Sequence, residues 1–398
     1  MPDLLKGLTA KKNLTILGIN SGTSADGIDL AAIKFAAAKN PEAEYIAGKM
    51  VSYPGKIKRE LENIIDDRRA ELERLSRLDI AYGQYLGRAA RKFIDETGLK
   101  IDAIASHGQT ISHYPYASKS LGIKTKATIQ IGDGNAIAFS SGLPTISDFR
   151  RADIACGGEG APLTPFVNQI LFGHARRGRI IVNIGGIANF SYHPSGQNYN
   201  QITGGDCGPG NVLSDTACKL MFGKLYDKNG EVASSGKIEN EIVSAIIKAN
   251  KRKSVSTGRE QFDYRLLARL VHISRKINAN KNSIVTSVCE GVARLIHKSI
   301  RKYLDEKYCE AVYLCGGGRK NIYLIKRLIE YCRPIPIWPI EKLGYDGDLL
   351  EAVGFAVLGG CYLNSIASTL PKVTGALAGG IAGKLSLPEG GKVGKMVK

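Results

Sequence analysis

GINSGTSADGID, residues 18–29, is the stretch of this 398-residue chain that decides its fold. The apolar runs 14–17 and 30–35 flank it, so it is predicted to be the turn of a β-hairpin near the N-terminus. It holds three glycines, three hydroxyl side chains and two carboxylates. Because glycines let a backbone approach a ligand closely and consecutive N–H groups in a turn bind anions, we expect this turn to bind a phosphate.

A second strand–turn–strand pattern, RIIVNIGGIANFSYH, occupies residues 179–193, and AVYLCGGG at 311–318 is typical of a buried strand that ends in glycines. Helical patterns mark residues 57–97, 211–223, 238–250, 265–304 and 348–366. Because the glycine hairpin occurs twice, each time with helices and strands after it, we predict two similar α/β domains with a nucleotide between them. This is the two-domain actin-like ATPase (ribonuclease H-like) architecture, with an interdomain nucleotide and substrate cleft. A dinucleotide-binding fold is disfavoured, because no GxGxxG joins a strand to a helix.

The chain is too long for one ordinary core, so two domains are expected. We assign residues 1–145 and 346–370 to an N-terminal lobe that carries the first phosphate turn. Residues 146–345 are assigned to a C-terminal lobe with the second hairpin and the glycine turn at 315–318. The Gly/Lys-rich stretch 371–398 is expected to be a tail that is mobile at its end.

Composition points to a globular, cytoplasmic protein. No apolar stretch of about 20 residues occurs, so no membrane span is expected. The N-terminal segment lacks the apolar core of a secretory signal. The eight cysteines form no CxxC pair, so zinc is not expected, and we interpret them as reduced thiols.

The formal net charge of +18 is compatible with nucleic-acid or anionic-membrane binding. The basic residues are nevertheless spread along the chain, with only small clusters at 174–179 and 248–253, and aromatic residues do not interleave with them. We therefore favour a basic surface that steers anionic substrates, and we expect neither nucleic acid nor a membrane as a partner.

Ordered motifs then add a family resemblance. They are GINSGTSADGID (18–29), SHGQT (106–110), QIGD (130–133), DFRRAD (148–153), GGEGAPLTP (157–165), NIGGIANF (183–190), GGDCGPGN (204–211), YDKNG (226–230), STGREQF (256–262) and CGGG (315–318). With them, about residues 14–377 resemble the anhydro-N-acetylmuramic acid kinase family of the actin-like ATPase superfamily. The resemblance implies a homodimer that uses ATP and Mg²⁺ in cell-wall recycling.

The reaction implied by the resemblance has two parts. ATP phosphorylates the 6-oxygen of 1,6-anhydro-N-acetylmuramic acid while water opens the anhydro ring at carbon 1, giving N-acetylmuramic acid 6-phosphate and ADP. The first part needs a held and neutralised γ-phosphate. The second needs a carboxylate that activates water, as in an inverting glycosidase.

The resemblance also implies which residues bind the nucleotide. The first phosphate turn consists of Gly22, Thr23, Ser24, Ala25, Asp26, Gly27, Ile28 and Asp29. The second phosphate contact consists of Asn183, Gly185 and Gly186, and the adenosine side consists of Gly316, Gly317 and Gly318. Each Gly-rich stretch is also compatible with a plain tight turn. The sequence identifies no metal ligands.

Four further residues are candidates for the chemistry of the sugar. The resemblance makes Asp206 the base that activates water, although a helix-capping or turn aspartate is the alternative. It makes Glu351 a hydrogen-bond partner of the sugar, whereas a lone carboxylate on an apolar helix also suits a surface boundary. Arg150 has the planar fork that suits a lactyl carboxylate or a phosphate, with Arg151 a structural ion-pair partner. His107 is either a substrate contact or a buried turn histidine.

Three departures from the family pattern stand out. Asn20 stands where the family usually has Met, and it aligns with an aspartate of other actin-like kinases. Gly205-Asp206-Cys207 replaces Phe-Asp-Thr, and residues 113–127 are longer than usual. Two alternatives therefore stay open: a kinase of the same fold with a different anhydrosugar, and a non-catalytic nucleotide-binding regulator or nucleic-acid-associated protein.

Overall fold

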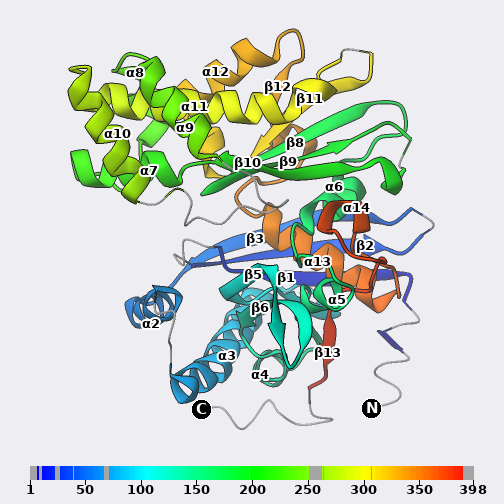
Figure 1. Ribbon diagram of the computed structural model, residues 1–398. Helices are drawn as coiled ribbons and strands as arrows, with labels where there is room; N and C mark the ends of the chain where they lie inside the picture. The colour runs from blue at the N-terminus through cyan, green and yellow to red at the C-terminus, as the bar shows by residue number, and fades with distance from the viewer. Residues whose placement is uncertain are drawn as a thin grey trace. The chain divides into compact units, whose positions relative to one another are not determined.

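The computed structural model describes residues 7–8, 11–22, 27–38, 40–66, 71–196, 198–250, 262, 264–305 and 307–388. The chain divides into two compact units (Figure 1). Unit 1 comprises Met1–Leu171 and Leu349–Lys398, and unit 2 comprises Phe172–Asp348. Unit 2 is therefore inserted into the sequence of unit 1.

Unit 1 is built on a six-stranded sheet with the strand order β13-β7-β4-β1-β2-β3. The strands are β1 (Asn13–Asn20), β2 (Gly27–Ala36), β3 (Glu42–Ser52), β4 (Ala103–Ser106), β7 (Thr145–Ser147) and β13 (Lys384–Ser386). The first three form an antiparallel meander, whereas β4 is parallel to β1 and β7 is parallel to β4. The hairpin predicted around residues 18–29 is confirmed, because β1 and β2 pair on either side of it.

Helices cover both faces of this sheet, as the alternation of side chains along β1 requires. Leu17 and Ile19 share a buried cluster with the apolar stripe of α3 (Leu72–Thr97), which lies below the sheet in Figure 1. Gly18 faces α13 (Leu350–Leu363), and a Cβ at this position would overlap the carbonyl oxygen of Ala352. The other helices of unit 1 are α2 (Gly55–Asp66), α4 (Gly134–Ser141), α5 (Arg151–Ala155), α6 (Thr164–Phe172) and α14 (Pro371–Thr374).

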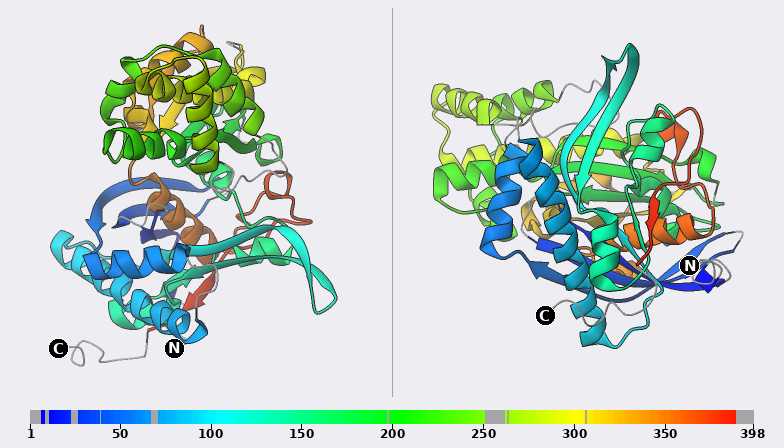
Figure 2. Two further views of the ribbon diagram at one scale, coloured as in Figure 1. Left: turned by 60° about the vertical axis from the view of Figure 1, so that its left-hand side comes forward. Right: turned by 90° about the horizontal axis from the view of Figure 1, so that it is seen from below.

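A long hairpin stands apart from the main sheet of unit 1. It consists of β5 (Gln109–Ser120) and β6 (Ile123–Ile131), which form a two-stranded sheet of their own. We call residues 109–131 the β5–β6 arm. Figure 2 shows it projecting from the rest of unit 1. The stretch 113–127 that departs from the family pattern forms most of this arm.

Unit 2 repeats the strand pattern of unit 1. Its five-stranded sheet has the order β10-β9-β8-β11-β12, with β8 (Gly178–Ile184), β9 (Ile187–His193), β10 (Thr203–Pro209), β11 (Cys309–Cys315) and β12 (Ile337–Pro339). The first three strands again form an antiparallel meander, and the last two are again parallel to the first. Both units thus place their strands in the order third, second, first, fourth, fifth, which confirms the predicted duplicated α/β fold.

A helical layer packs on the sheet of unit 2. Its members are α7 (Val212–Phe222), α8 (Glu231–Ser234), α9 (Asn240–Ala249), α10 (Tyr264–Lys276), α11 (Lys281–Ile300) and α12 (Ile322–Cys332). The single helix predicted over 265–304 is wrong, because Asn278 takes a left-handed φ of 53° and Asn280 caps a new helix by accepting from the Ser283 amide at 2.8 Å. In the described part of the chain no helix is both long and apolar enough to cross a membrane.

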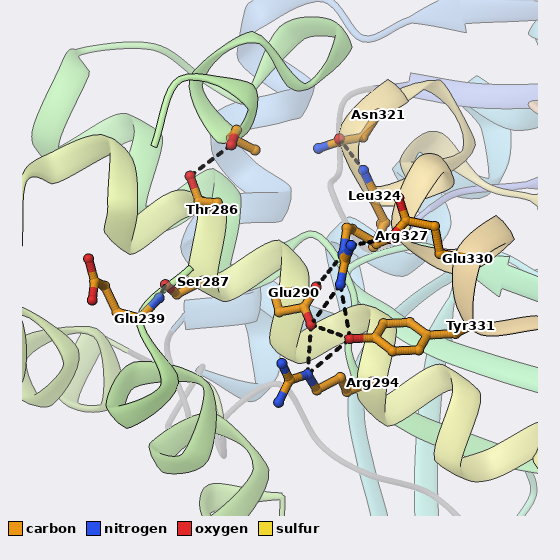
Figure 3. A network of polar contacts seen from close by, with 11 residues as sticks. Glu239, Thr286, Ser287, Glu290, Arg294, Asn321, Leu324, Arg327, Glu330 and Tyr331 are labelled. Atoms are coloured by element: carbon orange, nitrogen blue, oxygen red, sulfur yellow. Dashed lines mark hydrogen bonds and ion pairs between the residues drawn. The ribbon is translucent and has the colours of Figure 1, made fainter. Parts of the chain in front are cut away.

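A buried carboxylate joins two of these helices (Figure 3). Glu290 of α11 is fully buried, and it accepts from Arg327 of α12 at 2.7 Å and from Arg294 at 2.6 Å. The Tyr331 hydroxyl also donates to it. Burial by itself would raise the pKa of Glu290, but these donors hold its pKa below the usual value. The cluster ties α11 to α12.

The boundaries of the units differ from those predicted. Residues 146–171 lie in unit 1, because β7 pairs with β4 and the chain leaves unit 1 only after α6. Part of the expected tail is also structured. Its residues 384–386 form β13, which pairs antiparallel with β7, and α14 lies at 371–374. Alternation over three residues is too short a signal for sequence reasoning to detect.

Candidate active site

The first phosphate turn begins where β1 ends. Asn20 pairs in register with Asp29 of β2, so the turn lies between these two residues. Thr23, Ser24, Ala25 and Asp26 lie outside the described residues. Of the other expected members, Ile28 is buried, whereas Gly22, Gly27 and Asp29 are half-buried. A Cβ at Gly27 would overlap the carbonyl oxygen of Val51 on β3, so the close strand pairing requires glycine there.

Asn20 and Glu351 are brought together by the docking of α13 on β1. Glu351 is exposed in the first turn of a helix whose other residues are nearly all buried. The Asn20 amide Nδ2, which is buried, donates to Glu351 Oε2 at 2.8 Å. The structure thus assigns Asn20 to the orientation of Glu351. Sequence reasoning missed this contact, because the two residues are far apart in the chain.

A chain of buried hydroxyls supports the start of the turn. Ser21 Oγ donates to Gln109 and lies 2.6 Å from the Tyr53 hydroxyl, which lies 2.5 Å from the Tyr82 hydroxyl. Burial raises the pKa of Tyr53 to about 12, so both hydroxyls remain protonated at neutral pH. Because every partner is fixed by others, the network holds the end of β1 in one position.

His107 and Arg150 form a second pair in unit 1. Arg150 Nε donates to His107 Nε2 at 2.9 Å, and the other ring nitrogen, Nδ1, lies 3.1 Å from the carbonyl oxygen of Gly108. These contacts require a neutral ring with its proton on Nδ1. Burial and the charge of Arg150 lower the pKa of His107 well below its usual value, which agrees with that tautomer. His107 is thus buried with partners at both ring nitrogens, and its ring stacks on that of Phe355 with the centroids 4.4 Å apart.

Arg150 keeps its charge without a carboxylate partner among the described residues. Its side chain is half-buried, and its Nη1 donates to the carbonyl oxygen of Gly160 at 2.9 Å. Burial lowers the pKa of Arg150, while Glu351 and Asp153 act from farther away to raise it. Arg151 instead forms an ion pair with Asp148 at 3.6 Å. A fixed guanidinium of this kind suits an incoming carboxylate or phosphate.

His113, at the base of the β5–β6 arm, is a residue that sequence reasoning missed. Its Nδ1 lies 3.2 Å from Thr128 Oγ1, which already donates to the carbonyl oxygen of Ser112. His113 Nε2 is buried and has no partner in the described chain. Burial and the charge of Arg150 lower the pKa of His113 to about 4. The ring is therefore neutral, and Nε2 is a hydrogen-bond acceptor without a donor.

The second phosphate turn lies in unit 2, between β8 and β9. Gly185 and Gly186 form this turn, and their carbonyl oxygens accept from the amides of Asn211 at 2.8 Å and Gly210 at 2.9 Å. A Cβ at Gly210 would overlap the carbonyl oxygen of Gly185. The GPGN segment before α7 is therefore locked against the Gly-Gly turn, which ties two motifs that are separate in sequence.

The glycine turn at 316–318 lies beside the second phosphate turn. β11 is parallel to β8 with Cys315 opposite Asn183, so both strands end at the same edge of the sheet. Gly316 has a φ of 76°, and a Cβ there would overlap Asn183 Oδ1. A Cβ at Gly318 would overlap the side chain of Ile184. Gly317 lies between them. The structure thus brings Asn183, Gly185 and Gly186 together with Gly316, Gly317 and Gly318.

Asp206 belongs to a polar row that crosses this sheet. It lies opposite Asn189 of β9, and Asn189 in turn lies opposite Asn183 of β8. Directly opposite residues of antiparallel strands point to the same face, about 5 Å apart. All three side chains are half-buried. Asn189 was not singled out from the sequence, because only the strand register reveals the row.

A β-bulge follows Asp206. The register of β10 against β9 shifts between Asp206 and Gly208, which leaves Cys207 as the extra residue. Cys207 is fully buried, and its carbonyl oxygen accepts from Asn250 Nδ2 at 2.9 Å. A bulge of this kind re-aims the neighbouring side chain, and bulges are enriched next to active sites.

No group of three or more potential His, Cys, Asp or Glu ligands for a metal ion occurs among the residues described. A magnesium ion needs no such group, because it is held by one or two carboxylates, by water and by the phosphates of a nucleotide.

Comparison with known proteins gives the same family. The sequence model of anhydro-N-acetylmuramic acid kinase matches residues 14–387. The anhydro-N-acetylmuramic acid kinase of Caldanaerobacter subterraneus subsp. tengcongensis is 32% identical over 97% of this chain and 100% of its own length. The one from Crocosphaera subtropica is 34% identical over 94% of this chain and 98% of its own length.

One similar solved structure is the activator of the 2-hydroxyisocaproyl-CoA dehydratase from Clostridium difficile with bound ADPNP. The match covers 88% of this chain and 96% of the activator, with 13% sequence identity and a TM-score of 0.42. The family model spans nearly the whole described chain, and both units carry the expected motifs. The chain therefore belongs to the anhydro-N-acetylmuramic acid kinase family.

Proposed function

We propose that this chain uses ATP to phosphorylate O6 of 1,6-anhydro-N-acetylmuramic acid while water opens the anhydro ring, giving N-acetylmuramic acid 6-phosphate and ADP. The observation that carries the proposal is the row Asp206–Asn189–Asn183. The strand register of this row supports the proposal, because the proposed base and the proposed phosphate contact Asn183 both lie opposite Asn189. The homodimer and the cytoplasmic location implied by the resemblance belong to the same proposal.

Asp206 acts as the base. Its carboxylate takes a proton from water as the water oxygen bonds to carbon 1. The bond between carbon 1 and the bridging oxygen breaks, and that oxygen, O6, accepts the γ-phosphoryl group as ADP leaves. The bulge at Cys207, held by Asn250, fixes the direction of the Asp206 side chain.

The sugar is bound by residues of unit 1. The Arg150 guanidinium, held by His107 and Gly160, binds the lactyl carboxylate. Glu351 accepts hydrogen bonds from the sugar, and Asn20 orients it. Because His107 is neutral, it adds no second charge to compete for the carboxylate.

The glycine turns bind the nucleotide. Gly22, Gly27 and Asp29 of the first turn and Asn183, Gly185 and Gly186 of the second contact the phosphates, and Gly316, Gly317 and Gly318 lie by the adenosine. A bound Mg²⁺ neutralises the charge of the phosphates. Oxygen donors such as Asp29 suit the waters of this ion.

A coupled assay of ADP release, with and without the anhydro sugar, tests the activity. Wild type should release ADP only when the sugar is present. Asp206→Asn should lose turnover by a factor of about 10³ or more while nucleotide binding, measured by calorimetry, is retained. Asp346→Asn, at an exposed carboxylate of the same unit, is the matched control and should keep wild-type turnover. Normal turnover of Asp206→Asn would show that the base is misassigned.

The second candidate is a kinase of the same fold that acts on another anhydrosugar. The Gly205 and Cys207 neighbours of Asp206, which depart from the family pattern, favour it. A panel of 1,6-anhydro-N-acetylmuramic acid, 1,6-anhydro-N-acetylglucosamine and levoglucosan separates the two candidates. Arg150→Gln should raise KM about 10- to 100-fold for the muramic sugar alone, because the other sugars have no carboxylate. Nucleotide binding without ADP release for any sugar would instead indicate the non-catalytic regulator.

A further inference from the structure

The tip of the β5–β6 arm exposes apolar side chains. Ser120 and Ile123 pair across a two-residue turn formed by Leu121 and Gly122. Leu121 is 97% exposed and Ile123 is 67% exposed. The exposed Tyr114 and Tyr116 lie farther from the tip, on β5 of the same arm. Single exposed apolar residues are ordinary, but Leu121 and Ile123 together form a small apolar patch at the tip of the projecting hairpin.

The backbone of the tip is unfavourable for its sequence. Leu121 has a φ of 51° and Gly122 has a φ of 77°, so both central residues of the turn are left-handed. Asn, Asp and Gly take this conformation at low cost, whereas leucine does not. Leu121 at the first turn position is therefore unfavourable in two ways: its backbone is left-handed, and its apolar side chain is exposed to water. Strain of this kind is typical of sites that bind something.

The lysine side chains near the tip also indicate that it binds a partner. Lys119 and Lys124 are directly opposite each other across the two strands, an arrangement that destabilises an isolated hairpin. The arm contains no Asp or Glu at all. Lys126, farther from the tip, donates to the carbonyl oxygen of Gly157 at 2.8 Å and so ties the middle of the arm to another segment of unit 1. Lys119 and Lys124 have no ion-pair partner among the described residues.

We propose that the tip of the β5–β6 arm docks on a lipid bilayer that contains anionic lipid. Leu121 and Ile123 enter the boundary between headgroups and acyl chains, and Lys119 and Lys124 lie at the lipid phosphates, which relieve their mutual repulsion. Tyr114 and Tyr116 have the polar-tipped rings that suit the headgroup layer. Contact with nucleic acid would satisfy the lysines but leave Leu121 and Ile123 in water. The proposal revises the expectation that no membrane is a partner, and it restores one alternative raised by the net charge of +18.

Co-sedimentation of the full chain with vesicles tests the proposal. Vesicles of phosphatidylcholine mixed with phosphatidylglycerol are compared with vesicles of phosphatidylcholine alone. We expect binding to the mixed vesicles that weakens as salt is added. Leu121→Asn should weaken it about tenfold. Lys119→Glu with Lys124→Glu should weaken it at least about 20-fold, because each lysine near an anionic surface contributes about fivefold.

Matched controls separate the tip from general surface properties. Leu377→Asn removes a leucine of unit 1 that is 92% exposed but lies outside the arm, and Lys56→Glu with Lys100→Glu makes the same change of charge elsewhere in unit 1. Both should bind vesicles as the wild type does. Leu121→Asn should unfold at the same temperature as wild type or a higher one, because asparagine fits the left-handed turn. Its ADP release with soluble sugar should equal that of wild type.

Three outcomes would overturn the proposal. The first is no binding to the mixed vesicles. The second is binding that the tip variants leave unchanged. The third is self-association in solution that Leu121→Asn abolishes while vesicles have no effect, since the tip would then contact a second copy of the chain. The vesicle assay contains neither ATP nor sugar, so its result is independent of the kinase assay.

Discussion

Replacing Asn20 by aspartate tests the contact that orients Glu351. The Asn20 amide Nδ2 donates to Glu351 Oε2 at 2.8 Å. In Asn20→Asp an oxygen takes the place of that nitrogen, and two carboxylates then face each other at hydrogen-bond distance. Aspartate is also the residue that aligns here in other actin-like kinases. The variant therefore tests whether this chain needs an amide beside Glu351.

The magnitude follows from the burial of the two groups. Two unit charges about 4 Å apart repel by about 1 kcal/mol in water and by about 4 kcal/mol at a dielectric constant of about 20. Asn20 is buried and Glu351 is exposed, so an intermediate penalty of about 1–3 kcal/mol is expected. A proton shared by the pair removes the repulsion. The penalty is therefore small near pH 4 and complete by about pH 7, so that the stability of the variant relative to wild type falls as pH rises.

Urea unfolding of wild type, Asn20→Asp and Asn20→Met at about pH 4.5 and about pH 7.5 measures this effect. Asn20→Met restores the residue usual in the family and removes the donor without adding charge, so any cost it has should not vary with pH. A penalty for Asn20→Asp that is the same at both pH values, or no penalty at all, would refute the assigned contact between Asn20 and Glu351.

Three other perturbations probe the fold. Gly18→Ala should lower the free energy of unfolding by about 2–4 kcal/mol in urea, because its methyl group would push Ala352 and α13 away from β1. Glu290→Gln should cost about 3 kcal/mol at neutral pH, because Arg294 and Arg327 lose their buried counter-charge. Since its folded pKa is lowered, the contribution of Glu290 is present above about pH 5 and is lost as pH falls further, which thermal unfolding at a series of pH values detects. Truncation after residue 383 removes β13 and should lower the melting temperature of unit 1 by several degrees, as calorimetry would show.

Sequence reasoning succeeded where one local signal was sufficient. The apolar runs on either side of the glycine turns predicted β1–β2 and β8–β9, and both hairpins are confirmed. The same order of local patterns occurs twice in the sequence. This repetition predicted the duplicated fold, because similar patterns in the same order form similar arrangements of strands and helices. Gly18 and Gly210 mark backbone contacts, yet their sequence neighbourhood alone does not say with what.

The candidate site required information that local patterns do not contain. The row Asp206–Asn189–Asn183 depends on the register of three strands and on the bulge at Cys207, and a shift of one residue would turn each side chain to the opposite face. Likewise, the contact of Asn20 with Glu351 depends on where α13 docks. The resemblance supplied Asp206 and Glu351 as candidates, and only the fold supplies the residues that hold them.

The insertion of unit 2 has a consequence for how unit 1 forms the contact between Asn20 and Glu351. Glu351 and Phe355 lie on α13, which follows unit 2 in the sequence but packs on β1 of unit 1. Unit 1 therefore cannot complete its sheet face, or orient Glu351 by Asn20, until the chain beyond residue 348 is available. Unit 2 is one continuous segment with its own buried clusters, so its core depends on no residue that comes later. Closing the long loop between β1 and α13 costs chain entropy before any contact compensates it, so the close approach at Gly18 must contribute strongly once formed. The contact between Asn20 and Glu351 therefore depends on the last part of the chain.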